Sequence, residues 1–209
     1  MPGLSRRDLK EDRVRTAFED YEAFAKEHYR EIISYVVIAV VIAAAVFGVK
    51  YVVAQAEATA NTKLGAALDT YHAYVGPSSP EIANTGVQSF PTEQEKYKKA
   101  LAEFRAVGDV TGIERLLPRL KPMRLAQYYA ALCSAQLGDE AGALKGLEES
   151  SHDSDASIAS LAKFALAGEY VKTGKTQDAI KIYQELSEHP TATVPSVTAR
   201  LALAGVYRG

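Results

Sequence analysis

One short motif in this chain has residue types suited to binding phosphate. Residues 173–176, Thr-Gly-Lys-Thr, match the end of a phosphate-binding loop. That motif needs another glycine five residues before Gly174 and a preceding strand, whereas this chain has Glu169 there, in a segment with a helical pattern. A turn between two helices therefore explains these residues better than a nucleotide site.

The other residues that could do chemistry are isolated. His28, His72, His152 and His189 are scattered, and no His or Cys group has metal-ligand spacing. The single cysteine, Cys133, has no histidine nearby in sequence, which favours a small buried core residue over a nucleophile. We therefore expect no catalytic residue, no metal, no cofactor and no enzymatic activity.

Two polar clusters have a functional and a structural interpretation. Residues 152–155, His-Asp-Ser-Asp, could bind a cation weakly, but Ser and Asp more often cap a helix, here one starting near Ala156. The one basic cluster could meet anionic lipid or an acidic partner, although a solvated helix face is favoured; it contains Arg115, Arg119, Lys121 and Arg124. The net charge of −2 disfavours nucleic-acid binding.

A long uncharged stretch precedes all of these residues except His28. Residues 32–49 contain no charged side chain between Glu31 and Lys50. About 20 helical residues cross the roughly 30 Å hydrocarbon core of a bilayer, and Lys50 can extend its amine toward the interface while residues 51–53 complete the span. A buried strand is the alternative, but strands are typically about 3–10 residues long. The sequence predicts one transmembrane helix at 32–53.

The distribution of basic residues predicts the orientation of this span. Seven Lys and Arg residues precede it, whereas only Lys50 and Lys63 lie near its other end. Since Lys and Arg favour the cytoplasmic side, we expect residues 1–31 in the cytoplasm and residues 54–209 on the outer side of the membrane. If the source is a bacterium with two membranes, the span crosses the bacterial inner (cytoplasmic) membrane and residues 54–209 lie in the periplasm. A cleaved secretory signal ending at 54–56, Ala-Gln-Ala, is disfavoured, because signal apolar regions are only about 7–15 residues long.

The cytoplasmic segment also has a helical pattern. Val14, Phe18 and Tyr21 recur at steps of three and four, which predicts a helix over about residues 12–30. Such a helix can lie on the membrane surface, dock a partner or continue the spanning helix. Continuation of the spanning helix is favoured.

Residues 54–209 have the composition of packed helices, rich in Ala and Leu and without a strand pattern of period two. Strong helix formers from Ala54 to Tyr74 predict that the span passes directly into this domain. The Gly- and Pro-rich residues 76–80 end that helix, and a long loop is expected up to Pro91.

Caps and prolines indicate the next helices. Thr92 and Glu95 form a capping pattern for a helix ending at Gly108. Pro122 suits the first turn of a helix over about residues 123–137.

The last part of the chain repeats itself. Residues 162–170 and 199–207 share six of nine residues at an offset of 37. Gly138 and Gly174 each end a predicted helix and are followed five residues later by alanine, an offset of 36. A period in the mid-thirties with paired helices is typical of a helical solenoid, because one hairpin cannot bury its own apolar face.

The residues of these units resemble the tetratricopeptide-repeat superfamily. The clearest unit has the small-and-large pattern Leu166, Ala167, Tyr170, Gly174, Ala179 and Tyr183. The preceding unit has Ala130, Ala131, Gly138, Ala143 and Leu147. The resemblance covers about residues 92–209 and implies an all-α fold: a single transmembrane helix followed by a solenoid of helical hairpins.

With its short cytoplasmic segment and single span, the chain also resembles the membrane-anchored family that includes the ancillary subunit of the bacterial Sec translocon. That resemblance implies a periplasmic repeat domain that binds proteins or extended polypeptide segments, near translocon subunits and a periplasmic chaperone. Architecture rather than a diagnostic motif carries it. The alternative is a membrane-tethered scaffold for envelope assembly or cell division, which differs only in its partner.

The superfamily resemblance also implies a binding groove. Its fifth, ninth and thirteenth repeat positions line the concave side, and they correspond here to Tyr128, Leu132, Gln136, Phe164, Gly168, Lys172, Leu201 and Gly205. Large apolar groups beside small ones suit an apolar or extended polypeptide. The alternative is that Tyr128 and Phe164 only pack between neighbouring helices.

Overall fold

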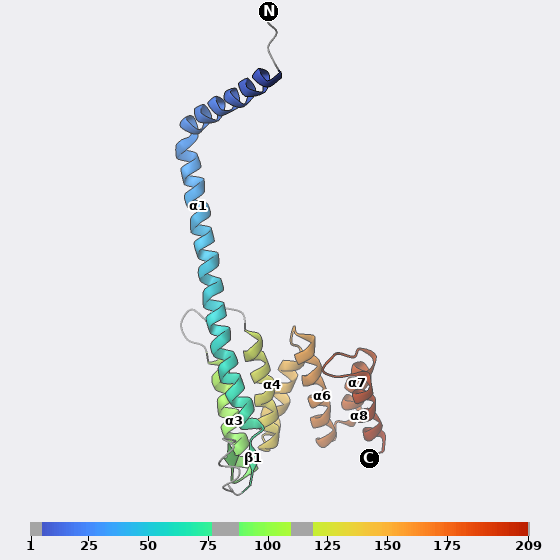
Figure 1. Cartoon of the computed structure of the whole chain (residues 1–209). Helices are drawn as coiled ribbons and strands as arrows, with labels where there is room; N and C mark the ends of the chain where they lie inside the picture. Colours follow the sequence, from blue (N-terminus) through green and yellow to red (C-terminus); the bar gives the residue numbers. More distant parts are fainter. Residues whose placement is uncertain (1–5, 77–87, 110–118, 209) are drawn as a thin grey trace, which may run out of the picture. The chain divides into compact units, whose positions relative to one another are not determined.

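The structure is a computed structural model that describes residues 6–76, 88–109 and 119–208, with the side chains of its first helix described from His28 onward. The chain divides into two compact units, residues 1–52 and 53–209. Its described part is almost entirely helical (Figure 1). The all-α class and the long apolar N-terminal helix are therefore confirmed.

The first helix, α1 (Arg6–Tyr71), is continuous over 66 residues. It joins the predicted upstream helix, the predicted span and the first predicted helix of residues 54–209. Its segment His28–Tyr71 is long and apolar enough to cross a membrane. Exposed side chains such as Tyr35 and Phe47, at 70% and 73%, form the kind of apolar surface that a bilayer can cover. The predicted apolar face of residues 12–27 lies on side chains outside the described part.

The end of α1 differs from the prediction. The helix ends at Tyr71 instead of Tyr74, because strand β1 (Tyr74–Val75) pairs in parallel with strand β2 (Ser89–Phe90). The amide of Tyr74 donates to the Gln88 carbonyl at 3.2 Å, so its hydrogen bond is made across strands instead of along the helix. Most of the predicted loop, residues 77–87, lies outside the described residues.

Helix α3 begins at its predicted cap, and helix α4 begins close to its predicted start. In α3 (Glu93–Gly108) the Glu95 amide donates to the Thr92 hydroxyl at 3.2 Å. Helix α4 (Lys121–Gln136) has Pro122 in its first turn, where the missing amide costs nothing. Its start lies two residues before the predicted one.

The last four helices are α5 (Glu140–Ser151), α6 (Ala156–Lys172), α7 (Thr176–Glu188) and α8 (Ser196–Arg208). The turns α4–α5 and α6–α7 have the same geometry. Gly138 and Gly174 have φ of 78° and 77°, in the left-handed region that favours glycine. The amide after each glycine donates to the carbonyl five residues earlier, Asp139 to Ser134 at 2.9 Å and Lys175 to Tyr170 at 2.8 Å.

Packing follows chain order. Each helix from α3 to α8 contacts the next one, and α4 also contacts α6 (Figure 1). The core is a row of three clusters, centred on Phe104, on Leu147 and on Tyr183. The C-terminal end of α1 contributes Ala60, Leu64 and Ala67 to the first cluster. The unit 53–209 is thus built from helices that bury their faces mainly on their sequence neighbours.

Candidate functional site

The predicted groove residues of α4 lie on one helix face, since Tyr128, Leu132 and Gln136 follow at steps of four. Tyr128 is only 8% exposed and packs with Leu147 of α5 and Ile158 of α6. Burial raises the pKa of Tyr128 to about 12. Leu132 is half-buried, and Gln136 is exposed. The outer end of this face is therefore open to a ligand, whereas its inner end is part of the core.

In α6 the exposure of the equivalent positions also increases toward the end of the helix, whereas in α8 the equivalent positions are all exposed. Phe164 packs edge-on against Tyr183 of α7, with ring centroids 5.4 Å apart. Gly168 is half-buried, and the Lys172 side chain is 64% exposed. On α8 the corresponding residues are exposed, namely Leu201 and Gly205. Binding of a polypeptide by these eight residues stays a prediction.

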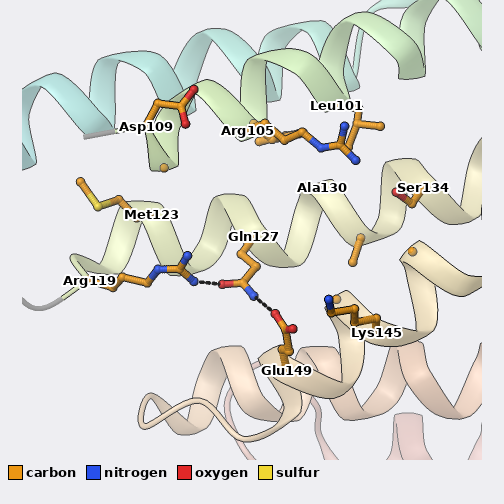
Figure 2. Close-up of a pocket in the computed structure, with 15 residues that line it drawn as sticks. Leu101, Arg105, Asp109, Arg119, Met123, Gln127, Ala130, Ser134, Lys145 and Glu149 are labelled. Carbon is orange, nitrogen blue, oxygen red and sulfur yellow. Dashed lines mark hydrogen bonds between the residues drawn. The ribbon is translucent and has the colours of Figure 1, made fainter. Parts of the chain in front are cut away.

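A pocket of about 490 Å³ opens on the face of α4 opposite the predicted groove residues. Figure 2 shows side chains of α3, α4 and α5 around it, with Ala130 and Ser134 on its α4 wall. At 3.6 residues per turn, these positions lie roughly opposite Tyr128 and Leu132. The pocket and the predicted groove are therefore separate surfaces of one helix.

Small residues bring the walls of this pocket close together. A Cβ atom on Gly146 of α5 would lie 2.8 Å from the Ala131 Cβ of α4, nearer than such atoms normally approach. The two helices can pack at this distance because position 146 has no side chain.

The rim of the pocket is charged. Arg119 donates to the Gln127 side chain, whose amide nitrogen donates to Glu149 at 2.7 Å (Figure 2). Arg105 and Lys145 also line the pocket. The arrangement has room for a small polar or amphipathic side chain, and the row of hydrogen bonds ties α4 to α5.

Cys133 is fully buried, as predicted. Burial raises the pKa of its thiol to about 12, outweighing the lowering effect of the nearby Lys96 charge. The reactive thiolate is therefore scarce at neutral pH.

The basic cluster contributes to the fold. Lys121 and Arg124 of α4 form ion pairs with Asp155 at 2.8 Å and with Asp153 at 2.6 Å, in the turn before α6. The Arg124 side chain is only 23% exposed, so this cluster is not the fully solvated helix face that was expected. The fourth member, Arg115, lies outside the described residues.

The segment 152–155 caps α6. The Ser157 amide donates to the Asp155 carboxylate at 2.9 Å. The hydrogen bond from Lys121, followed by that from Ser157, lowers the pKa of Asp155 below its ordinary value. Within residues 28–76, 88–109 and 119–208 no group of three or more His, Cys, Asp or Glu is arranged to hold a metal.

No protein-family model, curated protein or solved structure matches this chain.

The turn between α6 and α7 accounts for the phosphate-loop-like residues 173–176. The Lys175 amide donates to the Tyr170 carbonyl, and the Lys175 amine lies 5.2 Å from the Tyr170 ring centroid.

Sequence reasoning did not identify the pocket, because its lining comes from three helices that are separated in sequence. One signal for it was present. Gly142 and Gly146 are four residues apart on one face of α5, a spacing that permits close contact between helices. A second signal was a polar position that recurs at the repeat offset, Gln127 and Lys163, each bonded to a glutamate 22 residues later.

Proposed function

We propose that this protein is a membrane-anchored module that binds other polypeptides on a tetratricopeptide-like helical solenoid. The observation that carries the proposal is the recurrence of one helix-pair interface. Gln127 of α4 donates to Glu149 of α5, and 36 residues later Lys163 of α6 forms an ion pair with Glu185 of α7. Repetition of the same contact is how solenoids grow, and extended binding surfaces are their usual product.

The exposed ends of α4 and α6 support a polypeptide ligand. Gln136 and Lys172 are exposed at equivalent positions, beside the half-buried Leu132 and Gly168. Polar groups next to apolar and small ones can bind the backbone and the side chains of an extended segment.

The membrane context follows from the long helix and the basic residues before it. With residues 1–31 in the cytoplasm, residues 54–209 lie on the outer side of the membrane. In a bacterium with two membranes that compartment is the periplasm. There the module would be accessory to the Sec translocon and to periplasmic chaperones, as the family resemblance implies.

Site-specific photo-crosslinking in living cells tests the binding surface. A crosslinker at Gln136 or Lys172 should trap a protein partner. Lys181 of α7 is a matched control, because it is a comparably exposed lysine that also pairs with an acid three residues earlier. Equal trapping at all three positions, or trapping at Lys181 alone, would contradict a binding face on α4 and α6.

Topology and partners need a second experiment. Protease added to spheroplasts should digest residues 54–209 and spare an N-terminal tag, whereas protection of the repeats would contradict the orientation. Purification in mild detergent should then recover translocon subunits and a periplasmic chaperone. Recovery of division or cell-wall proteins instead would favour the scaffold.

A further inference from the structure

The pocket between α3, α4 and α5 lies where one helical hairpin has smaller residues than the next. At an offset of 36, the second hairpin has large side chains where the pocket lining has small ones, namely Leu166 for Ala130, Tyr170 for Ser134 and Ile182 for Gly146. The three large side chains all pack in the core cluster centred on Leu147. The first hairpin lacks the side chains that fill this place in the second, and a pocket of about 490 Å³ remains. Its volume is in the range of small-ligand sites.

Ser134 gives this pocket a polar group without a partner. The residue is only 3% exposed and lines the pocket from α4 (Figure 2). Its hydroxyl forms no hydrogen bond with any described residue. Buried hydroxyl groups are normally hydrogen-bonded, because burial removes their contacts with water. The Ser134 hydroxyl is therefore available to a ligand in the pocket.

Two cationic side chains on the walls are also unpaired. Arg105 of α3 and Lys145 of α5 line the pocket on the two sides of α4 (Figure 2). Within the described part of the chain, neither forms a hydrogen bond or an ion pair. Figure 2 shows the Arg105 guanidinium directed away from Asp109, the acid one helical turn later. These two cations favour an anionic ligand group.

The other charged groups of the lining limit the charge of that ligand. Arg119 and Glu149 are already joined through Gln127. The acids Asp109 and Glu149 both line the pocket, so they disfavour an anion of higher charge such as phosphate. A single carboxylate is the anion that fits two cations and one hydroxyl.

The rest of the lining is suited to an apolar group. Leu101, Phe104 and Met123 line the pocket together with Ala130. An apolar group placed against these side chains leaves water, which favours binding.

We propose that this pocket binds a carboxylate that is attached to an apolar group. Arg105 and Lys145 pair with the carboxylate, and the Ser134 hydroxyl donates a hydrogen bond to it. The last residue of a polypeptide has this chemistry, and so does a free aromatic acid. The site lies on the face of α4 opposite the predicted groove residues, so the inference does not rest on the proposed function.

The test is a saturation-transfer NMR titration of the full chain in micelles of a non-ionic detergent. The probe is N-acetyl-phenylalanine, and its uncharged amide is the matched control for binding to the micelle and to apolar surfaces. The wild-type chain should bind the acid saturably and about tenfold more tightly than the amide, since the amide cannot form charge-assisted hydrogen bonds. Absence of saturable binding, or equal binding of acid and amide, would overturn the inference.

Charge variants test the two cations. Arg105→Gln and Lys145→Gln should each weaken binding of the acid about two- to fivefold, as expected for an exposed ion pair, and leave binding of the amide unchanged. Lys181→Gln is the matched control, because Lys181 is the equivalent exposed lysine of the next hairpin and is not part of the pocket lining. Equal weakening by Lys145→Gln and Lys181→Gln would contradict the site.

Two further variants test the α4 wall. Ser134→Ala should weaken binding of the acid about threefold without lowering the Tm, because the hydroxyl has no partner among the described residues. A lower Tm with unchanged binding would instead show a structural role. Ala130→Leu introduces the residue of the next hairpin and should abolish binding of both probes in a chain that circular dichroism shows to be folded.

An acetylated tetrapeptide ending in phenylalanine identifies the source of the carboxylate. Tighter binding of the tetrapeptide than of N-acetyl-phenylalanine indicates the end of a polypeptide, and weaker binding indicates a free acid. The Arg105, Lys145 and Ser134 variants leave Gln136 and Lys172 unchanged, so failure of this site is distinguishable from failure of the proposed function by crosslinking.

Discussion

Helices α6 and α8 contain nearly the same nine residues but lie in different surroundings. Leu166 and Ala167 of α6 are 5% and 0% exposed, whereas Leu203 of α8 is half-buried and Ala204 is exposed. The side of each helix that faces the preceding helix is buried in both cases, as the fully buried Ala162 and Ala199 show. For Ala167 the difference is the covering helix α7, which α6 has and α8 lacks among the described residues. Leu166 is buried instead in the cluster that α6 forms with α4 and α5.

A repeated sequence thus specifies a repeated interface, and the surroundings decide whether that interface is occupied.

Removal of residues 197–209 should have the largest effect. Helix α8 contributes Ala199, Leu203 and Val206 to the third core cluster. Their loss exposes apolar area of α7, at a cost on the order of 3 kcal/mol or more. Thermal unfolding of the full chain in detergent, followed by circular dichroism, should show a lower Tm. An unchanged melting curve would mean that α8 does not stabilise the domain.

Truncation of the matched leucines should destabilise the chain more in α6 than in α8. Leu166→Ala should destabilise the chain by about 2–4 kcal/mol, because it leaves a cavity between α5 and α6. Leu203→Ala should cost clearly less, because Leu203 is already partly solvated. Chemical denaturation measures both values. Equal losses would contradict the difference in packing.

Replacement of the matched alanines by leucine should destabilise the chain in α6 but hardly in α8. Ala167→Leu forces a larger side chain into a filled interface with α7 and should cost about 1–3 kcal/mol. Ala204→Leu places the same side chain on the exposed side of α8 and should change the free energy of unfolding little. A large loss for Ala204→Leu would show that this side of α8 is covered.

Alkaline pH should weaken the covered interface. Burial raises the pKa of Tyr183 above its ordinary value of 10. The neutral phenol is then favoured in the folded state, so this contribution to stability is complete below about pH 10 and is lost as pH rises through the folded-state pKa. The Tyr183→Phe variant should lose less stability than the wild-type chain in this window, measured by denaturation at several pH values. Parallel pH profiles would contradict the assignment.

Glycine replacements should give the smallest effects, of opposite sign. A Cβ on Gly205 meets nothing within 4 Å, so Gly205→Ala should stabilise α8 by up to about 1 kcal/mol through helix propensity. Gly146→Ala should destabilise the chain, because its Cβ would lie 2.8 Å from that of Ala131. If both variants were stabilised, the close contact between α4 and α5 would be weaker than the structure indicates.

Much of the fold was predictable from local signals. The cap at Thr92, the proline at 122 and the glycines at 138 and 174 act within a few residues, so each marks its helix boundary in the sequence. The end of α1 was predicted three residues too late, because β1 pairs with a strand 15 residues further along the chain. A nonlocal hydrogen bond leaves no signal in helix propensity.

Composition and spacing were enough to predict the long apolar helix, the class of fold and the period of the repeat. Which of the equivalent residues are covered could be read only from the packed helices. Phe164 and Leu201 occupy the same repeat position, yet one packs on Tyr183 and the other is 67% exposed. Burial is a property of the neighbouring helix as much as of the residue, and that neighbour is not encoded at the position itself.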